Sequence, residues 1–435
     1  MKSTAQLRRR ILSRRATIAV VGQGYVGLSV ACAAAEVGFA VTGIDTDAAR
    51  IDDLREGVLS VPGVPDAVFR AGVDTGNLSF TTEAEAIESS DIILICVPTP
   101  VRENTPDLSL VEGASKDVGR HLRAGSLVVL ESTTYPGTTE ELVSPLLETS
   151  GLVAGRDFLL AYSPERIDPG NGEFVLRNTP RVVGALTPES AGVAALFYAQ
   201  LVDEVRVVSS CRAAELAKLL ENTFRHVNIG LVNEMAMICH EMGIDVWEVV
   251  DAAASKPFGF MPFYPGAGVG GHCIPVDPAY LAWQVRRDAG RQFRILEEAQ
   301  DVNAQMPAYV AARIADALNE HGRAMKGANI IVLGVAYKPD VADVRESPSL
   351  RVMHVLEKRG AKVSFHDPYV DSVTYNGSAH TRTDLTTKVL AQSDCVAVLT
   401  PHRAYDLDWI ASQAGLVFDA RNAYGPKRPA NVVKL

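Results

Sequence analysis

Short runs of apolar, mostly β-branched residues alternate with longer segments of helical pattern over the first two hundred residues. The runs lie at residues 17–22, 92–98, 126–132, 158–164 and 180–185. Continuous apolar strands separated by helices are typical of a parallel sheet that is covered on both faces. The pattern therefore predicts one doubly wound α/β domain over residues 16–208, preceded by a basic extension at residues 1–15.

The middle of the chain has a helical period instead. Residues 209–253 contain no proline and two glycines. A segment rich in proline and glycine follows at 255–278, and the helical pattern resumes over 279–290 and 295–318. We expect a central helical domain over residues 209–322 with one long helix. Because such helices often form subunit interfaces, the chain is expected to be a homodimer or a higher homo-oligomer.

A second strand and helix series occupies the C-terminal part. Apolar strand patterns at 328–340, 361–368, 394–402 and 416–422 flank a helical segment at 347–360. This predicts a further α/β domain over residues 323–435. The fold class is therefore α/β, with two Rossmann-like doubly wound domains joined by a central helical domain. Ligands are expected in the cleft between the two α/β domains.

Charge and cysteine usage exclude several classes of protein. The formal net charge of the 435 residues is −10, which argues against nucleic acid and membrane surfaces as partners. The six cysteines are far apart and form no CxxC pair, which favours reduced thiols in the cytoplasm over a disulfide scaffold or a metal site. Five arginines precede the first apolar run, but no cleavage site follows, so we expect no export signal.

The first candidate site is the glycine motif between the first strand and the first helix. Gly22, Gly24 and Gly27 form a GxGxxG pattern, and Asp45 ends the next strand. In this context the motif predicts a dinucleotide site in which the helix N-terminus binds a pyrophosphate. The carboxylate of Asp45 favours NAD over NADP, because it repels a 2′-phosphate. For Arg50, a contact with the cofactor and a solvated helix position are both open.

Polar residues follow several predicted strands at their carboxyl ends. Thr99, Thr133 and Glu165 belong to such segments. Open parallel sheets bind ligands at this edge. Because serine, threonine, proline and glycine are also ordinary turn formers, a ligand site and simple turns are both open for these segments.

One face of the long predicted helix carries Lys218, Asn222 and Arg225 at positions i, i+4 and i+7. A solvated face is one interpretation. The other is that these side chains point into a cleft, since asparagine is an unusual choice for an exposed helix interior.

The sequence GAGVGGHCIPVD at 266–277 places four glycines, a histidine, a cysteine and an aspartate in one loop. Glycines allow a close approach of backbone to a ligand and leave access to the thiol of Cys273. A nearby ammonium such as that of Lys218 would lower the pKa of this thiol and stabilise an oxyanion formed on its adduct. A small apolar filler is the alternative for the cysteine. His272 stays unexplained, and no metal is expected.

These motifs together resemble those of a known family. The sequences VVGQGYVGL, VPTP, ESTTYPGTT, SPER, ELAKLLENTFRHVNIGLVNE, GVGGHCIPVDPAYL and GVAYKPDVADVRESPS are similar, in this order, to motifs of the nucleotide-sugar 6-dehydrogenases. That family includes UDP-glucose and GDP-mannose dehydrogenases, and the resemblance is strongest to UDP-N-acetylglucosamine 6-dehydrogenases. UDP-N-acetylmannosamine dehydrogenases are the near neighbours.

The resemblance implies an NAD-dependent, four-electron oxidation of a C6 hydroxymethyl group through a thiohemiacetal and a thioester on Cys273. It implies that Lys218 and Asn222 stabilise the oxyanion and that Asp277 assists proton transfer. Thr133 would hold the catalytic water, and Glu165 would serve in thioester hydrolysis.

The resemblance also completes the list of expected binding residues. Cofactor contacts are expected from Gly22, Gly24, Tyr25, Val26, Gly27, Asp45, Arg50, Pro98, Thr99, Thr133 and Arg345. Contacts with the UDP-sugar are expected from Glu165, Arg166, Lys218, Asn222, Arg225, Phe263, Tyr264, Gly270, Lys338 and Arg421.

Two departures from the UDP-glucose branch argue against UDP-glucose as substrate. This chain has Glu131 where that branch has the lysine of KST, and Arg166 where it usually has phenylalanine.

UDP-N-acetylglucosamine is the expected substrate, with UDP-N-acetylmannosamine or UDP-glucose as alternatives. Surface polysaccharide synthesis is the implied pathway class. A catalytically dead nucleotide-sugar sensor is the alternative outside the dehydrogenases, although Cys273, Lys218 and Asp277 are all present.

Overall fold

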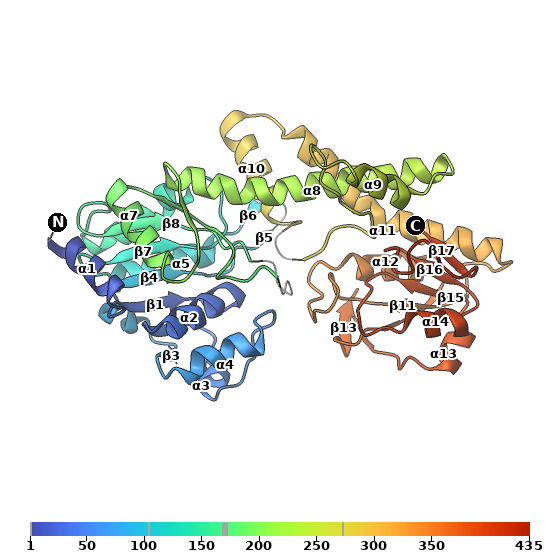
Figure 1. Ribbon diagram of the computed structural model, residues 1–435, viewed down its shortest axis with the longest axis horizontal. Helices are drawn as coiled ribbons and strands as arrows, with labels where there is room; N and C mark the ends of the chain where they lie inside the picture. Colours follow the sequence, from blue (N-terminus) through green and yellow to red (C-terminus); the bar gives the residue numbers. More distant parts are fainter. Residues whose placement is uncertain (1, 103–104, 168–172, 272–273) are drawn as a thin grey trace. The chain divides into compact units, whose positions relative to one another are not determined.

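Two units make up the chain, each built on a sheet with helices packed against it (Figure 1). The computed structural model describes residues 2–102, 105–167, 173–271 and 274–435. Unit 1 consists of Met1–Glu221 with Ala279–Asp288, and unit 2 of Asn222–Pro278 with Ala289–Leu435. The domain boundaries expected after residues 208 and 322 stay predictions.

The sheet of unit 1 has eight strands. Their spatial order is β10 (Val205–Val207), β9 (Arg181–Ala185), β8 (Leu159–Tyr162), β7 (Leu127–Leu130), β4 (Ile92–Ile95), β1 (Thr17–Val21), β2 (Ala40–Ile44) and β3 (Leu78–Thr81). The predicted parallel pairing is confirmed from β8 to β3. It is wrong at β9, which runs antiparallel to β8, while β10 is parallel to β9.

The connection between β8 and β9 explains this reversal. A parallel pair needs a crossover, usually a helix, whereas an antiparallel pair needs only a loop. Among the described residues between the two strands, 163–167 and 173–180, no helix occurs. By contrast, β9 and β10 are joined through helix α7 (Pro188–Tyr198) and are parallel.

Both faces of this sheet are buried, as a doubly wound fold requires. Ile92 and Leu94 belong to one core cluster with Phe197 of α7, and the alternate residues Ile93 and Ile95 are equally buried on the other face. The same cluster contains Leu7 and Ile11 of α1 (Lys2–Leu12). The segment expected to be a basic extension is therefore a helix packed on the domain core, a feature that its few apolar residues did not reveal.

Unit 2 contains the second α/β sheet, which confirms the predicted fold class. Its strands are all parallel in the order β12 (Lys362–His366), β11 (Asn329–Leu333), β15 (Cys395–Val398), β16 (Val417–Asp419) and β17 (Val432–Lys434). One face packs on α11 (Arg294–Glu320) and α12 (Pro348–Lys358), and the other on α13 (Thr387–Gln392) and α14 (Leu407–Gln413).

The predicted long helix is α8 (Cys211–Glu241), with 31 residues. It is followed by α9 (Val246–Ala254), α10 (Asp277–Ala289) and α11, which continues through Pro307. The remaining helices are α2 (Tyr25–Val37), α3 (Ala48–Arg55), α4 (Asp66–Asp74), α5 (Ser109–His121), α6 (Ser144–Leu147) and the short η1 (Ala84–Ser89), η2 (Thr139–Val143) and η3 (Glu148–Ser150).

Two small hairpins pair β5 (Val101–Arg102) with β6 (Thr105–Pro106) and β13 (Ser372–Tyr375) with β14 (Ser378–Thr381). No helix in the described part of the chain is long and apolar enough to cross a membrane.

Candidate functional site

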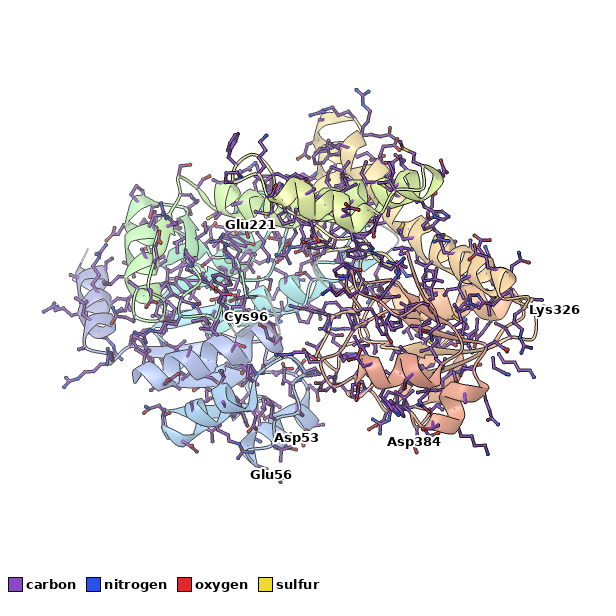
Figure 2. All side chains as sticks on the ribbon, turned by 45° about the vertical axis from the view of Figure 1, so that its right-hand side comes forward. Asp53, Glu56, Cys96, Glu221, Lys326 and Asp384 are labelled. Atoms are coloured by element: carbon purple, nitrogen blue, oxygen red, sulfur yellow. The ribbon has the colours of Figure 1, made fainter. Side chains whose placement is uncertain are left out.

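The glycine loop between β1 and α2 has the geometry of an anion site. Gly22 has a φ of +94°, and a Cβ there would lie 2.8 Å from the carbonyl oxygen of Cys96, the buried residue after β4 (Figure 2). A Cβ at Gly27 would lie 1.9 Å from the oxygen of Gly22. Gly24, the residue that caps α2, has open space around its Cβ position and no side-chain cap. The N-terminus of α2, which has no side-chain cap, therefore suits the pyrophosphate of the expected dinucleotide.

Asp45, directly after β2, connects this loop to the next strand. Its Oδ2 accepts a hydrogen bond from the backbone N–H of Gln23 at 2.7 Å and forms an ion pair with Arg50 Nη1 at 2.8 Å. Arg50 also pairs with Asp47 at 3.3 Å. The Arg50 guanidinium is thus bound to two carboxylates near its own helix start, and its contact with the cofactor stays a prediction.

The other expected cofactor residues of unit 1 lie around the same edge of the sheet. Tyr25 begins α2, and Val26 beside it packs against the hydrophobic core. Pro98 and Thr99 follow β4, and Thr99 is buried. The Thr99 carbonyl accepts a hydrogen bond from the Tyr280 hydroxyl at 3.0 Å, so α10 holds this strand end in place.

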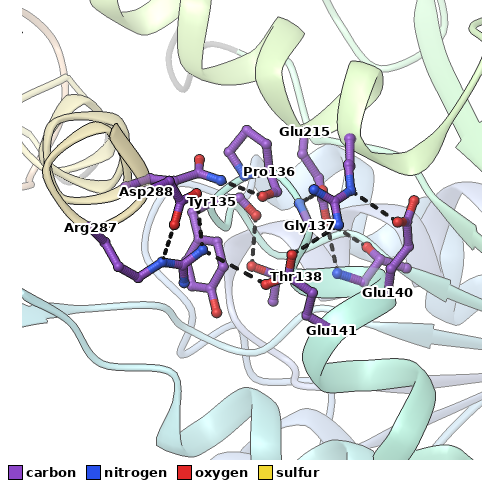
Figure 3. A network of polar contacts seen from close by, with 12 residues as sticks. Tyr135, Pro136, Gly137, Thr138, Glu140, Glu141, Glu215, Arg287 and Asp288 are labelled. Carbon is purple, nitrogen blue, oxygen red and sulfur yellow. Dashed lines mark hydrogen bonds and ion pairs between the residues drawn. The ribbon is translucent and has the colours of Figure 1, made fainter. Parts of the chain in front are cut away.

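The turn after Thr133 is held by a buried carboxylate of α8 (Figure 3). Glu215 accepts hydrogen bonds from the backbone N–H groups of Gly137 at 2.5 Å and Thr139 at 2.9 Å, and from the Thr139 hydroxyl at 2.7 Å. Burial raises the pKa of Glu215, while these donors act in the opposite direction. Gln284 of α10 donates to the Pro136 carbonyl at 2.6 Å. Two helices thus fix the turn that carries Thr133, which is half-buried.

Glu165 lies in a cluster of buried charges after β8. Its Oε1 accepts hydrogen bonds from the backbone N–H groups of Arg166 at 2.6 Å and Ile167 at 2.7 Å. Its Oε2 pairs with Arg181 at 2.5 Å. The Arg166 side chain points elsewhere, to Glu221 at 2.8 Å and the Pro180 carbonyl at 2.6 Å.

Lys218 is the most unusual cation of unit 1. It is 8% exposed, and its ammonium forms no ion pair or hydrogen bond with any residue that the structure describes. A buried charge without a partner is costly, because it loses its hydration without compensation. Such a side chain is suited to meet an anion that is supplied by a ligand or a reaction intermediate.

In unit 2 the structure brings two predicted catalytic residues together. The Asn222 amide of α8 donates to Asp277 Oδ2, the first residue of α10, at 2.5 Å, and both side chains are buried. The amide is thereby oriented by a carboxylate. Arg225, the third residue of the predicted polar face, is exposed instead.

Cys273 and His272 lie outside the described residues, but the glycines before them are explained by packing. A Cβ at Gly266 would lie 2.4 Å from Arg421 Nη1, and one at Gly270 would lie 2.9 Å from the carbonyl oxygen of Glu346. The N–H of Gly271 donates to the Arg345 carbonyl at 3.1 Å. These glycines therefore allow close contact with the segments after β11 and β16, and access for a ligand stays a prediction.

Two further residues expected to bind the substrate, Phe263 and Tyr264, each pack against another aromatic side chain of unit 2. Phe263 packs edge-on against Phe224, with 5.8 Å between ring centroids. Tyr264 stacks on Trp247 at 5.7 Å and is half exposed. A contact of either side chain with the substrate stays a prediction.

The three predicted basic residues of the C-terminal domain differ in how they are held. Lys338 follows β11, and Arg345 forms a two-pronged pair with Asp343, at 3.0 Å and 2.6 Å. Arg421 follows β16, and its guanidinium lies against Gly266. Burial lowers the pKa of Arg421, against the opposing effect of Asp419. The Arg421 guanidinium forms no ion pair with any residue that the structure describes.

Sequence reasoning did not identify three buried residues around these sites: Glu131 as a contact of Arg181, Arg181 itself, and Glu215. The available signal was a charged residue within or directly beside an apolar strand or helix pattern, as at Arg181 in PRVVGA. Among the described residues, no group of three or more histidine, cysteine, aspartate or glutamate side chains is arranged to hold a metal.

Comparison with known proteins places these features in one family. Residues 16–202 match the NAD binding domain of the UDP-glucose/GDP-mannose dehydrogenase family, residues 212–305 its central domain and residues 331–426 its UDP binding domain. The chain is 37% identical over 360 residues to a UDP-N-acetyl-D-glucosamine 6-dehydrogenase of Pseudomonas aeruginosa, covering 82% of this chain and 83% of that protein. It is 34% identical over 412 residues to a UDP-N-acetyl-D-mannosamine dehydrogenase of Pyrococcus horikoshii, covering 93% and 95%. A solved structure of the UDP-D-ManNAc dehydrogenase from Pyrococcus horikoshii superposes with a TM-score of 0.86 at 33% identity, covering 96% of this chain and 98% of that one.

Proposed function

The chain belongs to the UDP-glucose/GDP-mannose dehydrogenase family, and from this premise we propose that it oxidises the C6 hydroxymethyl group of a UDP-N-acetylhexosamine to a carboxylate. The proposed substrate is UDP-N-acetylglucosamine, supported by the motif resemblance and by the relative at 37% identity. UDP-N-acetylmannosamine is the second candidate, because relatives with that name align over 93% of the chain.

The proposed reaction has two oxidations and one hydrolysis. NAD, when bound, accepts one hydride in each oxidation. We assign Cys273 as the nucleophile: its thiolate sulfur adds to the C6 aldehyde, and loss of the second hydride from the thiohemiacetal leaves a thioester. Water then forms the new C–O bond, the C–S bond breaks, the thiolate leaves, and a base takes the proton of the water.

The buried ammonium of Lys218 is the observation that carries this proposal. The thiohemiacetal and the tetrahedral adduct of hydrolysis both bear negative charge on oxygen. A cation that is 8% exposed and unpaired among the described residues stabilises that charge far more than it stabilises a neutral substrate. We assign Asn222 to the same oxyanion, with Asp277 orienting its amide through the 2.5 Å hydrogen bond.

The remaining assignments concern water and the two nucleotides. Thr133 and Glu165 are proposed to hold the hydrolytic water. We propose that Lys338 and Arg421 bind the UDP moiety, and the weak compensation of the Arg421 guanidinium supports a diphosphate as its partner. Arg345 is proposed to contact NAD, which requires it to exchange its pair with Asp343.

We further propose that α8 mediates a homodimer. Five exposed apolar residues recur along this helix at intervals of four and seven, the spacing of a single helix face: Leu216, Leu220, Phe224, Leu231 and Ile238. A solvent-facing stripe of this length is unusual for a monomer and suits a second copy of the same helix.

An NADH assay tests the proposed function. The chain is incubated with NAD and, in turn, UDP-N-acetylglucosamine, UDP-N-acetylmannosamine, UDP-N-acetylgalactosamine, UDP-glucose and GDP-mannose. We expect two NADH per sugar and the highest kcat/KM for UDP-N-acetylglucosamine. Cys273→Ser should still bind both ligands but lose turnover. One NADH per sugar, or full activity of Cys273→Ser, would contradict the four-electron mechanism.

A further inference from the structure

Behind Glu165, a buried arginine joins two carboxylates that come from different strand ends. Arg181, the first residue of β9, is 3% exposed. One terminal nitrogen pairs with Glu165 Oε2 and the other with Glu131 Oε2, each at 2.5 Å. Its Nε donates to the Ser163 hydroxyl at 2.9 Å. All three nitrogens of the guanidinium therefore have different partners.

Tyr198 adds a further contact with both Glu131 and Arg181. The Tyr198 hydroxyl of α7 donates to Glu131 Oε1 at 2.5 Å, and the Arg181 guanidinium lies 4.8 Å from the centre of the Tyr198 ring. Glu131 is 1% exposed, and burial raises its pKa. A chain of contacts thus runs from Tyr198 through Glu131 and Arg181 to Glu165, entirely within unit 1.

We propose that Arg181 is a positioning residue that sets the orientation of Glu165 for hydrolysis of the acyl-enzyme, an inference that rests on the proposed function. A carboxylate has about four acceptor positions. Three of those on Glu165 are taken, by Arg181 and by the backbone N–H groups of Arg166 and Ile167. One position is left, and a water bound there has a fixed direction relative to the strand end.

The geometry requires arginine and not only a positive charge. The two terminal nitrogens of a planar, forked cation can each hold one carboxylate, whereas an ammonium is a single point that cannot occupy both positions. In Arg181→Lys the charge remains, but Glu165 or Glu131 loses its partner. The expected effect is a loosely oriented Glu165, which affects the step that uses water and spares the oxidations that precede it.

Single-turnover and steady-state kinetics with mass spectrometry test this role. Arg181→Lys is mixed with NAD and the UDP-sugar that wild type oxidises. The initial burst of NADH should keep its rate within about twofold, while steady-state turnover falls at least about tenfold, the effect of losing a charge-assisted hydrogen bond. Acid-quenched enzyme should carry the mass of an acyl group on Cys273.

Two further variants separate positioning from folding. Tyr198→Phe keeps Arg181 and removes only the hydroxyl contact with Glu131, so it should give a smaller change of the same kind. Arg313→Lys replaces another buried arginine, whose Nη2 donates to the Lys434 carbonyl at 3.1 Å. It should lower stability without accumulation of the acyl-enzyme.

Failure of the positioning role and failure of the proposed function give different results. If the burst and the steady state fall equally in Arg181→Lys and in Tyr198→Phe, or if neither variant accumulates an acyl adduct, Arg181 has no positioning role, and the proposed function stands because wild type is active. If wild type forms no NADH with any of the nucleotide sugars, the proposed function is wrong and the role of Arg181 falls with it.

Discussion

Replacing Glu215 by glutamine should loosen the turn after Thr133, because the Glu215 side chain accepts three hydrogen bonds from this turn (Figure 3). Glutamine has the same shape but only one acceptor oxygen. If this oxygen faces Thr139, the new NH2 group faces the N–H of Gly137, from which Glu215 accepts at 2.5 Å. Two donors then point at each other in a buried place.

The expected loss of folding free energy follows from this one unsatisfied N–H group. Leaving one buried N–H unsatisfied costs about 1–3 kcal/mol. For a unit of this size, a loss of about 2 kcal/mol lowers Tm by roughly 4–8 °C. Calorimetry of wild type and Glu215→Gln at the same pH measures the shift, with urea unfolding as an independent measure of the free energy.

Glu140→Gln is the matched control, since it makes the same chemical change in the neighbouring turn. Glu140 pairs with Arg212 at 3.0 Å on the surface, where such pairs contribute about 0–1 kcal/mol. We expect a shift of Tm of at most about 4 °C for this variant, and a smaller one than for Glu215→Gln. Equal shifts for the two variants would refute the role assigned to the buried carboxylate.

The difference in stability between wild type and Glu215→Gln should also depend on pH. Burial raises the pKa of Glu215 above its ordinary value of 4.5, so its ionisation costs more in the folded protein than in the unfolded chain. The stability of wild type relative to Glu215→Gln is therefore greatest below pH 4.5 and should decrease as pH rises above that value. An increase over this range would show that the three donors outweigh burial.

Two further predictions concern the cofactor and the assembly. Asp45→Ser removes the charge that faces a 2′-phosphate, so the ratio of kcat/KM for NADP to that for NAD should rise at least about tenfold in steady-state assays, and an unchanged ratio would contradict the role of Asp45. Leu220→Asp should convert the proposed dimer to a monomer in sedimentation analysis, whereas Leu12→Asp, a residue of α1 with the same 61% exposure, should not. A dimer that persists in Leu220→Asp would exclude this face of α8.

The sequence predicted the sheets well, because strands buried on both faces have continuous apolar runs. The two α/β sheets and the long α8 are all confirmed. The direction of β9 was not predicted, since the apolar run at 180–185 has the same pattern in either orientation. Direction depends on the connection, and this connection lacks a pattern of its own. The helix at 2–12 was missed because its buried face consists of few apolar residues among arginines.

The site was predictable where one local motif forms it and not where distant residues meet. The GxGxxG loop and the nearby Asp45 could be interpreted from spacing, because β1, α2 and β2 are consecutive. Glu215 and Gly137 are 78 positions apart, and Arg181 joins carboxylates from two other strand ends. Nothing in the local pattern pairs them.

The glycine loop before Cys273 packs closely on other parts of unit 2. In the sequence, its glycines suggested access for a ligand, whereas in the structure Gly266 and Gly270 meet Arg421 and the backbone of Glu346. A side chain at either glycine would displace the loop from the segment that carries the proposed nucleotide-binding residues. Glycine therefore contributes to this site by allowing one part of the protein to pack closely on another, and ligand access is a separate property. Substitutions at these glycines are expected to act through the position of the loop, which couples the proposed nucleophile to the UDP-binding sheet.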